Sequence, residues 1–288
     1  MPAEALESHI AHLIEMLDLD GFEVNPRRYQ DSYRVDDPDQ KKLHLKVDPL
    51  QDVFILETPE GTGLGIRAHH KTATNYQTGE RKRAIYLEGT PWQRGFLVGL
   101  MAHQSVKRMA VDFVDNLSSS MLSPDNPSKF LLIIIDLIVR LLFPKWIREI
   151  KKDIEPEALD MFESEIDGIW KGCRAVDRLT EVRTWRLWSI NAGFDGLLAH
   201  AYTRILPGKG DNHPLDRPVS PMCNGFVMMG DIAGGRHFIG RDLMFPDARV
   251  LQDVACLMII KPVSDNGTES LPFISMCTPG MVGSFAGV

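Results

Sequence analysis

The sequence predicts an α+β protein, and three observations carry this prediction. An amphipathic N-terminus is followed by short strand-like runs. A long middle part has apolar residues at helical spacing, and in the C-terminal part the apolar period falls to two. The chain has 288 residues, of which 44% are hydrophobic and 25% are charged. This composition is typical of one large globular domain or of two modest ones.

The N-terminal part is predicted to begin with a helix and to continue as a small antiparallel sheet. Residues 1–20 have amphipathic spacing, and the charged stretch 31–42 is predicted to be a loop. Three apolar runs bounded by proline or glycine then follow, at Val53–Thr58, Leu64–His70 and Ala84–Glu88. Runs of this length and composition indicate the strands of a meander.

A helix is expected to start directly after Thr90. Threonine caps helix N-termini well, and Pro91 would occupy the first helical position, where a missing N–H costs nothing. Gly95 and Gly99 lie four residues apart, on one face of this helix. Each glycine costs a helix about 1 kcal/mol, so two on one face predict close approach to another backbone. The alternative, two incidental small residues, stays open.

The helical pattern continues to about Arg204. The last helix places Trp188, Asn191 and Asp195 on one face through steps of 3 and 4 residues. We expect the two polar residues to anchor the structure through buried hydrogen bonds, with a catalytic role as the alternative. Leu206–Pro221, with four prolines and two glycines, is the best internal boundary of the chain.

Strand periodicity returns after this boundary. A Gly-Gly turn between the first two candidate strands and Asp265-Asn266-Gly267 between the last two both indicate hairpins. The four strand candidates are Asn224–Met229, His237–Phe245, Ala255–Val263 and Leu271–Cys277. The chain is therefore predicted to comprise an N-terminal helix and loop (1–42), a mainly helical segment with a small sheet (43–205), a linker (206–222) and a strand-rich part (223–288).

Charge and cysteine content exclude several classes of function. The formal net charge is −7 and the isoelectric point is near 5.7, so no nucleic-acid partner is expected. The four cysteines form no CxxC pair, and the sequence predicts neither a metal site nor a cofactor. The N-terminus lacks a basic region followed by an apolar core, which predicts a cytoplasmic protein.

The most apolar run, Phe130–Phe143, is too short to span a bilayer, which needs about 20 apolar residues. Asp136 and Arg140 interrupt it at the spacing of a helical ion pair. A buried helix is the first interpretation. Two alternatives stay open: contact with a membrane or a lipidic substrate, and a subunit interface in a homo-oligomer.

The junction between Met222 and Cys223 carries the most chemical information. A cysteine that opens a strand directly after a linker suggests a nucleophile freed by cleavage of its own peptide bond. A cysteine thiol with a pKa near 8.5 needs a base, and an N-terminal α-amine with a pKa of about 7.7–8.0 can supply one. The alternative is an inert buried cysteine. Cys256 and Cys277 are interpreted as core strand residues, and Cys173 as a helical residue beside Trp170.

Two neighbours of Cys223 could complete such a site. Arg241, at the end of the second strand of the predicted hairpin, would supply a cation beside the thiol. Asn224 is the nearest candidate for a donor to an oxyanion, and its alternative role is half of a simple Asn-Gly turn.

These motifs also carry a resemblance. MCNGFVMMG followed by HFIGRDLMF resembles the N-terminal-nucleophile (Ntn) hydrolases of the penicillin acyltransferase type, whose relatives include bile salt hydrolase and acid ceramidase. In that family a cysteine opens a strand and a Gly-Arg-x-x-Asp-Phe-like segment follows; here Arg241 follows Cys223 by 18 residues. The stretch LEGTPWQRGFLVGLMAH and the segment Ser189–Asp195 resemble the family's proenzyme helices, so the resemblance runs from about residue 84 to the end.

The resemblance implies an αββα sandwich preceded by a helical proenzyme segment. It implies autoproteolysis between Met222 and Cys223, with Cys223 as the nucleophile and Arg241 as its cationic partner. The substrate would be a small molecule with a linear, non-peptide amide bond, often bearing a fatty or aromatic acyl group. Hydrolysis or acyl transfer would proceed through a thioester, without a cofactor.

Two departures from the family pattern are visible. The position three residues after the arginine, an aspartate in the family, is Met244; Asp242 is the nearest acid, one residue after Arg241 and so on the opposite face of a strand. Only 66 residues (288 − 222) run from Cys223 to the last residue, and no counterpart of the family's downstream oxyanion-hole asparagine is found. We therefore expect either the N-terminal part of a longer proenzyme or a chain whose remaining strands come from another chain, with little activity of its own. A catalytically inactive Ntn-fold binding or assembly module is the alternative, and a lipid-interacting helical protein is a third.

Overall fold

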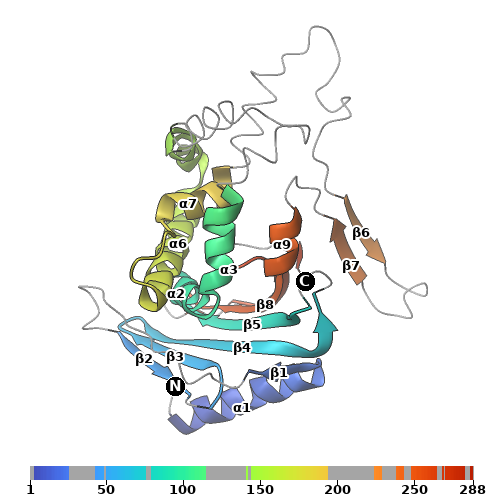
Figure 1. Ribbon diagram of the computed structural model, residues 1–288. Helices are drawn as coiled ribbons and strands as arrows, with labels where there is room; N and C mark the ends of the chain where they lie inside the picture. Colours follow the sequence, from blue (N-terminus) through green and yellow to red (C-terminus); the bar gives the residue numbers. More distant parts are fainter. Residues whose placement is uncertain are drawn as a thin grey trace.

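The computed structural model describes residues 3–25, 43–48, 50–75, 79–114, 141, 144–193, 224–228, 238–242, 248–264, 268, 270–282 and 286–287. Within this part, one large sheet lies between α1 on one face and a layer of helices on the other (Figure 1). The predicted α+β class is confirmed. Some predictions concern residues outside the described part: 31–42, Phe130–Phe143 (apart from residue 141), Asp195 and Leu206–Pro221.

The N-terminal part folds as the sequence predicts, with two further strands. Helix α1 spans Ala3–Leu19, β3 spans Val53–Thr58, β4 spans Gly61–Thr74 and β5 spans Arg81–Gly89. The last three form the predicted antiparallel meander. The additional strands, β1 (Phe22–Val24) and β2 (His44–Val47), have only three and four residues, which is too short for a clear alternating pattern.

The helices come next along the chain. Helix α2 covers Pro91–Met101 and is followed by the short α3 (His103–Lys107) and the π-helix η2 (Arg108–Phe113). A helix over residues 144–153 precedes α6 (Pro156–Val176), and the short α7 (Thr184–Trp188) leads into the π-helix η3 (Ser189–Gly193).

The C-terminal part contains a strand within each of the four predicted ranges. They are β6 (Asn224–Met228), β7 (Phe238–Asp242), β8 (Cys256–Pro262) and β9 (Phe273–Cys277). A short helix, α9 (Ala248–Val254), and a final strand, β10 (Ala286–Gly287), were not predicted.

The sheet is larger than the small meander that the sequence predicts. It has eight strands in the order β10-β9-β8-β5-β4-β3-β2, with β1 paired to β4. The β5–β8 pair is parallel, and all the other pairs are antiparallel. Strands from both sides of the expected linker therefore form one sheet, because β8 pairs with the edge that the meander leaves open at β5.

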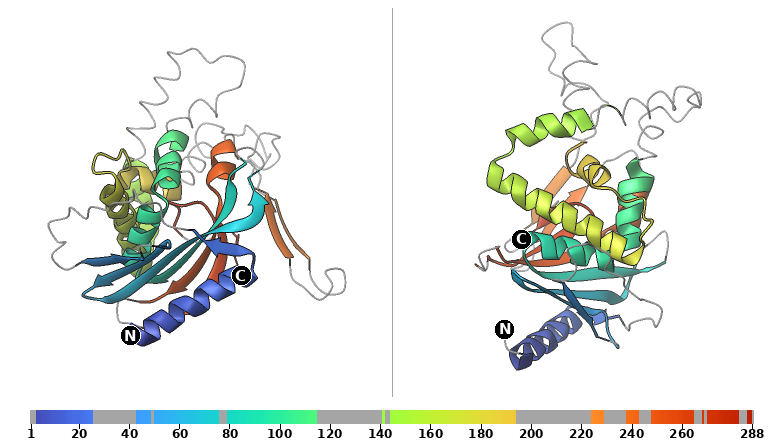
Figure 2. Two further views of the ribbon diagram at one scale, coloured as in Figure 1. Left: turned by 60° about the horizontal axis from the view of Figure 1, so that its bottom comes forward. Right: turned by 90° about the vertical axis from the view of Figure 1, so that its left-hand side faces the viewer.

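Two hydrophobic cores cover the two faces of this sheet. Alternate residues of β5 enter different cores: Ile85 and Leu87 face the helix layer, whereas Ala84 and Tyr86 face α1. Figure 2 shows α1 running alone beneath the sheet and the other helices stacked on the opposite side. The larger core includes residues of β8, β9 and α9 together with those of α2 and α6, so the part after the linker is packed into the part before it.

Two pairs of glycines bring α2 and α6 into backbone contact. A Cβ on Gly95 would collide with the Glu165 carbonyl and lie 3.0 Å from the Ile169 nitrogen. On the facing helix, a Cβ on Gly172 would lie 2.9 Å from the Leu100 nitrogen. Gly99 and Gly168 are enclosed in the same way. The predicted close approach is confirmed, and α6 contributes a matching pair at the same spacing of four residues.

The start of α2 is a capping box. The Thr90 hydroxyl accepts a hydrogen bond from the Gln93 amide, and the Gln93 side chain accepts one from the Thr90 amide at 2.9 Å. Pro91 occupies the first helical turn, as predicted. The helix therefore begins where β5 ends, and this fixes how α2 crosses the sheet.

Candidate functional site

The predicted nucleophile hairpin forms a separate two-stranded sheet. Strands β6 and β7 pair antiparallel, with Asn224 opposite Asp242 and Gly225 opposite Arg241. Figure 1 shows this hairpin beside the main sheet, and β7 lies next to β10. Of the predicted site residues, Asn224, Arg241 and Asp242 are placed by their backbones, while Met222 and Cys223 lie outside the described residues.

The register separates the two charged candidates. Arg241 and Asp242 are consecutive strand residues, so they belong to opposite faces of the hairpin. Asp242 shares a cross-strand pair with Asn224, and Arg241 shares one with Gly225, which has no side chain. The Gly225 partner therefore adds no side chain of its own to the Arg241 face.

Three of the four cysteines are poor nucleophiles. Cys173 of α6, Cys256 of β8 and Cys277 of β9 are buried in the larger core. Burial raises the pKa of each thiol, to about 12 for Cys256 and for Cys277. A thiol with so high a pKa is almost never ionised at neutral pH. The prediction that Cys256 and Cys277 are core strand residues is confirmed, and Cys173, predicted only to lie on a helix, is buried as well.

Asn191 has the structural role that the sequence predicts. Its side-chain amide donates to the Leu187 carbonyl at 2.8 Å and to the Gly280 carbonyl at 2.9 Å, and its carbonyl oxygen accepts from the Val282 amide at 2.6 Å. These bonds tie η3 to the loop after β9. They consume the donors and the acceptor of the side chain, which leaves it no free group for catalysis.

A polar cluster between α1 and the sheet was not predicted. Glu88 of β5 accepts hydrogen bonds from Tyr86 at 2.8 Å and from Lys261 of β8 at 2.9 Å, and it pairs with His9 of α1 at 2.8 Å. Burial raises the pKa of Glu88, but the hydrogen bonds from His9, Lys261 and Tyr86 outweigh it and hold the pKa below its usual value. The cluster fastens α1 to the sheet. Tyr86 and Glu88, two apart in a strand, were its only sequence signal.

A second group of charges lies on the opposite face of the sheet, toward the helix layer. Asp52 is fully buried and pairs with Arg67 at 2.8 Å, while Arg67 also donates to the Met101 carbonyl at the end of α2. Burial and the neighbouring arginines lower the pKa of His69 to about 4, so its imidazole is neutral at pH 7. These residues lock β4 to α2 and make no open site.

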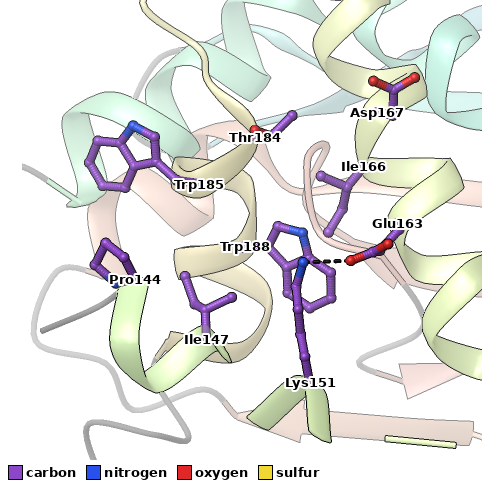
Figure 3. Close-up of a pocket in the computed structure, with 9 residues that line it drawn as sticks. All are labelled: Pro144, Ile147, Lys151, Glu163, Ile166, Asp167, Thr184, Trp185 and Trp188. Carbon is purple, nitrogen blue, oxygen red and sulfur yellow. Dashed lines mark hydrogen bonds and ion pairs between the residues drawn. The ribbon is translucent and has the colours of Figure 1, made fainter. Parts of the chain in front are cut away.

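An open pocket of about 350 Å³ lies between the helix over residues 144–153, α6 and α7. Its lining combines indole and aliphatic side chains with two carboxylates and one lysine, as Figure 3 shows. The Lys151 ammonium lies 4.2 Å from the centre of the Trp188 ring and 2.6 Å from the Glu163 carboxylate. Trp188 was predicted to share a helix face with Asn191, but the pocket was not predicted, because its walls come from three separate segments.

Two negative findings apply to the described residues. No helix among them is long and apolar enough to cross a membrane. They also contain no group of three or more histidine, cysteine, aspartate or glutamate residues able to hold a metal ion.

Comparison with known proteins gives one relative. No protein family and no solved structure matches the chain. An uncharacterized protein of Archaeoglobus fulgidus is 30% identical over 213 residues, which cover 71% of this chain and 30% of the relative. The chain thus matches a region that makes up less than a third of that protein's length.

Proposed function

We propose that this chain carries the nucleophile of an autoprocessing cysteine Ntn hydrolase or acyltransferase that acts on linear amides. The observation that carries the proposal is the register of the β6–β7 hairpin. Residues two apart in a strand share a face, so an extended chain at position 223 presents its side chain on the face of Gly225. Gly225 is paired with Arg241, which brings a cation to the side where Cys223 would lie.

The burial of the other three cysteines also supports Cys223 as the nucleophile. Cys173, Cys256 and Cys277 are buried thiols with raised pKa values. That leaves Cys223, which lies outside the described residues, as the cysteine that we propose for the nucleophile. The αββα sandwich also belongs to this proposal. The described residues form one eight-stranded sheet between α1 and a layer of helices, with the two-stranded β6–β7 sheet beside it.

The proposed reaction starts once the Met222–Cys223 bond is cut. The free α-amine of Cys223 takes the proton of its thiol, and the thiolate attacks the carbonyl carbon of the amide. The ammonium then returns the proton to the leaving nitrogen as the C–N bond breaks, which leaves a thioester on the sulfur. Water or an acceptor amine attacks the thioester, releases the acyl group and restores the thiol.

Arg241 and Asn224 have separate roles in this proposal. A guanidinium beside the thiol favours the thiolate and lowers its pKa. Asn224, the residue after the nucleophile, would donate to the oxyanion through its backbone N–H, because its side chain belongs to the opposite face of β6. One such donor is typically worth about 2.7–4 kcal/mol in the transition state. Asp242 lies on the other face of β7 and pairs with Asn224, so we assign it to positioning of that residue rather than to contact with substrate.

The test is the fate of the Met222–Cys223 bond. We expect N-terminal sequencing and intact-mass measurement of the purified protein to give one fragment that ends at Met222 and another that begins Cys-Asn-Gly. Cys223→Ala should abolish the cut, whereas Cys256→Ala, which removes a buried thiol of β8, should leave it intact. Cleavage at this bond in Cys223→Ala, or its absence from the unaltered protein, would overturn the proposal.

Covalent labelling tests the nucleophile itself. An acyl-mimicking electrophile should modify Cys223 selectively, and Arg241→Met should slow this modification by about tenfold or more, because a neighbouring cation stabilises the thiolate. Arg186→Met, which removes an arginine from α7, is the matched control and should not slow it. A chain that cuts itself but never labels at Cys223 would instead fit a non-catalytic binding module.

A further inference from the structure

The pocket between α6, α7 and the helix over residues 144–153 has the chemistry of a cation site. Trp185 and Trp188 supply indole rings, and Glu163 and Asp167 supply carboxylates around a volume of about 350 Å³. Aromatic ring faces attract cations through their negative electron density, and carboxylates add direct charge attraction. Lys151 is the one cationic side chain of the lining. The Asp167 carboxylate is already paired with Lys171 at 3.4 Å and accepts from the Trp92 indole at 2.9 Å, so Glu163 supplies the charge attraction in this pocket.

One cation already occupies the best position in this pocket. The Lys151 ammonium lies over the Trp188 ring and pairs with Glu163, and it comes from the wall opposite α6, as Figure 3 shows. Both ends of the ion pair reach solvent, with exposed fractions of 29% for Lys151 and 47% for Glu163. The lysine can therefore swing out into water at small cost, because exposed ion pairs contribute little stability.

We propose that this pocket binds a small organic ammonium ion, which takes the place of the Lys151 ammonium between the Trp188 ring and Glu163. Trp188 is held firmly, with an exposed fraction of 5%, so its ring is a preformed platform. Ile147 and Ile166 would contact the alkyl groups of the ligand. The site is independent of the cysteine chemistry proposed above, since none of its residues belongs to the β6–β7 hairpin.

The choice of probe separates charge from shape. Choline and 3,3-dimethyl-1-butanol have nearly the same shape, but the alcohol replaces the charged nitrogen with carbon. Isothermal titration calorimetry at low ionic strength should show choline binding at least about threefold more tightly, the effect of one cation–π contact at an exposed site. Equal affinity for the two, or binding of neither, would overturn the proposal.

Removal of the resident cation gives the sharpest test. Lys151→Met should tighten choline binding by about fivefold, because the ligand no longer competes with the lysine. Lys152→Met, at the neighbouring exposed lysine that pairs with Glu149, is the matched control and should change nothing. Glu163→Gln should weaken binding by a similar factor without loss of helical circular dichroism. Unchanged affinity in Lys151→Met, or equal tightening in both lysine variants, would contradict competition for one site.

Discussion

At the scale of single residues, burial decides which ionisable groups can do chemistry. Three cysteine thiols lie in the large core, and burial raises their pKa values beyond the reach of neutral pH. His103, which contacts Thr180 at 3.2 Å, is also buried, and burial lowers its pKa. None of these shifts is visible in the sequence, because each depends on which side chains the fold brings around the group.

His69 is expected to make the protein sensitive to mild acid. The pKa of its imidazole is about 4 in the folded state, against an ordinary value near 6.5, since burial and nearby arginines disfavour the cation. Between these two pH values the unfolded chain binds a proton that the folded chain does not. Stability should therefore fall as the pH is lowered from about 6.5 to about 4, by about 1–2 kcal/mol from this residue after solvent screening.

Urea denaturation at a series of pH values measures this effect. His69→Gln should flatten the dependence between about pH 6.5 and 4, because glutamine does not titrate. His12→Gln, which replaces an exposed histidine of α1, is the control and should keep the slope of the unaltered protein. The slope that remains in His69→Gln is expected to come partly from His103. An undiminished slope in His69→Gln would contradict the assignment.

At the scale of elements, the contact between α2 and α6 is the most specific feature of the helix layer. Both helices carry glycines four residues apart, and each glycine sits against the backbone of the other helix. Backbone atoms cannot rotate away as side chains can, so the pair of helices tolerates no added methyl group there. The sequence indicated this for Gly95 and Gly99, and it holds an equal pattern at Gly168 and Gly172 that was not among the predicted contacts.

Gly95→Ala and Gly172→Ala should each destabilise the protein. Alanine would favour the helix itself by about 1 kcal/mol, but a methyl group inside the contact forces the two backbones apart. Overpacking of this kind typically costs about 1–3 kcal/mol, and more where backbone must move, so we expect a net loss of about 2 kcal/mol. Urea denaturation measures it, with Met161→Ala on the exposed face of α6 as the control. A net gain in stability in either glycine variant would show that the contact is loose.

At the scale of the whole molecule, the sheet unites segments that lie on both sides of residues 206–222. Strand β8 pairs along β5 from Ala84↔Leu257 to Gly89↔Pro262, and β9 extends the sheet further. Met258 and Ile260 of β8 enter the same core as Phe96 of α2. A cut between these segments would therefore leave two pieces that share one sheet and one hydrophobic core.

This arrangement predicts that the two fragments stay associated after the backbone is cut between them. A recognition site for a specific protease is inserted between Pro207 and Pro221, and the protein is cut there. The cut protein should elute as one species in size-exclusion chromatography without denaturant. The same sample should separate into two fragments in urea, since urea weakens burial of apolar surface. The inserted site combined with Cys223→Ala distinguishes this nick from any cut at Met222. Separation of the fragments without denaturant would contradict a shared core.

Local patterns in the sequence determined the elements of this protein, and only the tertiary structure decided how they are joined. Amphipathic spacing, the Thr90-Pro91 cap and apolar runs bounded by turn residues predicted α1, β3, α2 and the β6–β7 pair, because each depends on neighbours in the chain. The parallel β5–β8 pair, the burial of the cysteines, the cluster around Glu88 and the pocket at Trp188 join residues far apart in sequence. Such contacts arise from the packing of both faces of one sheet, which no single segment encodes.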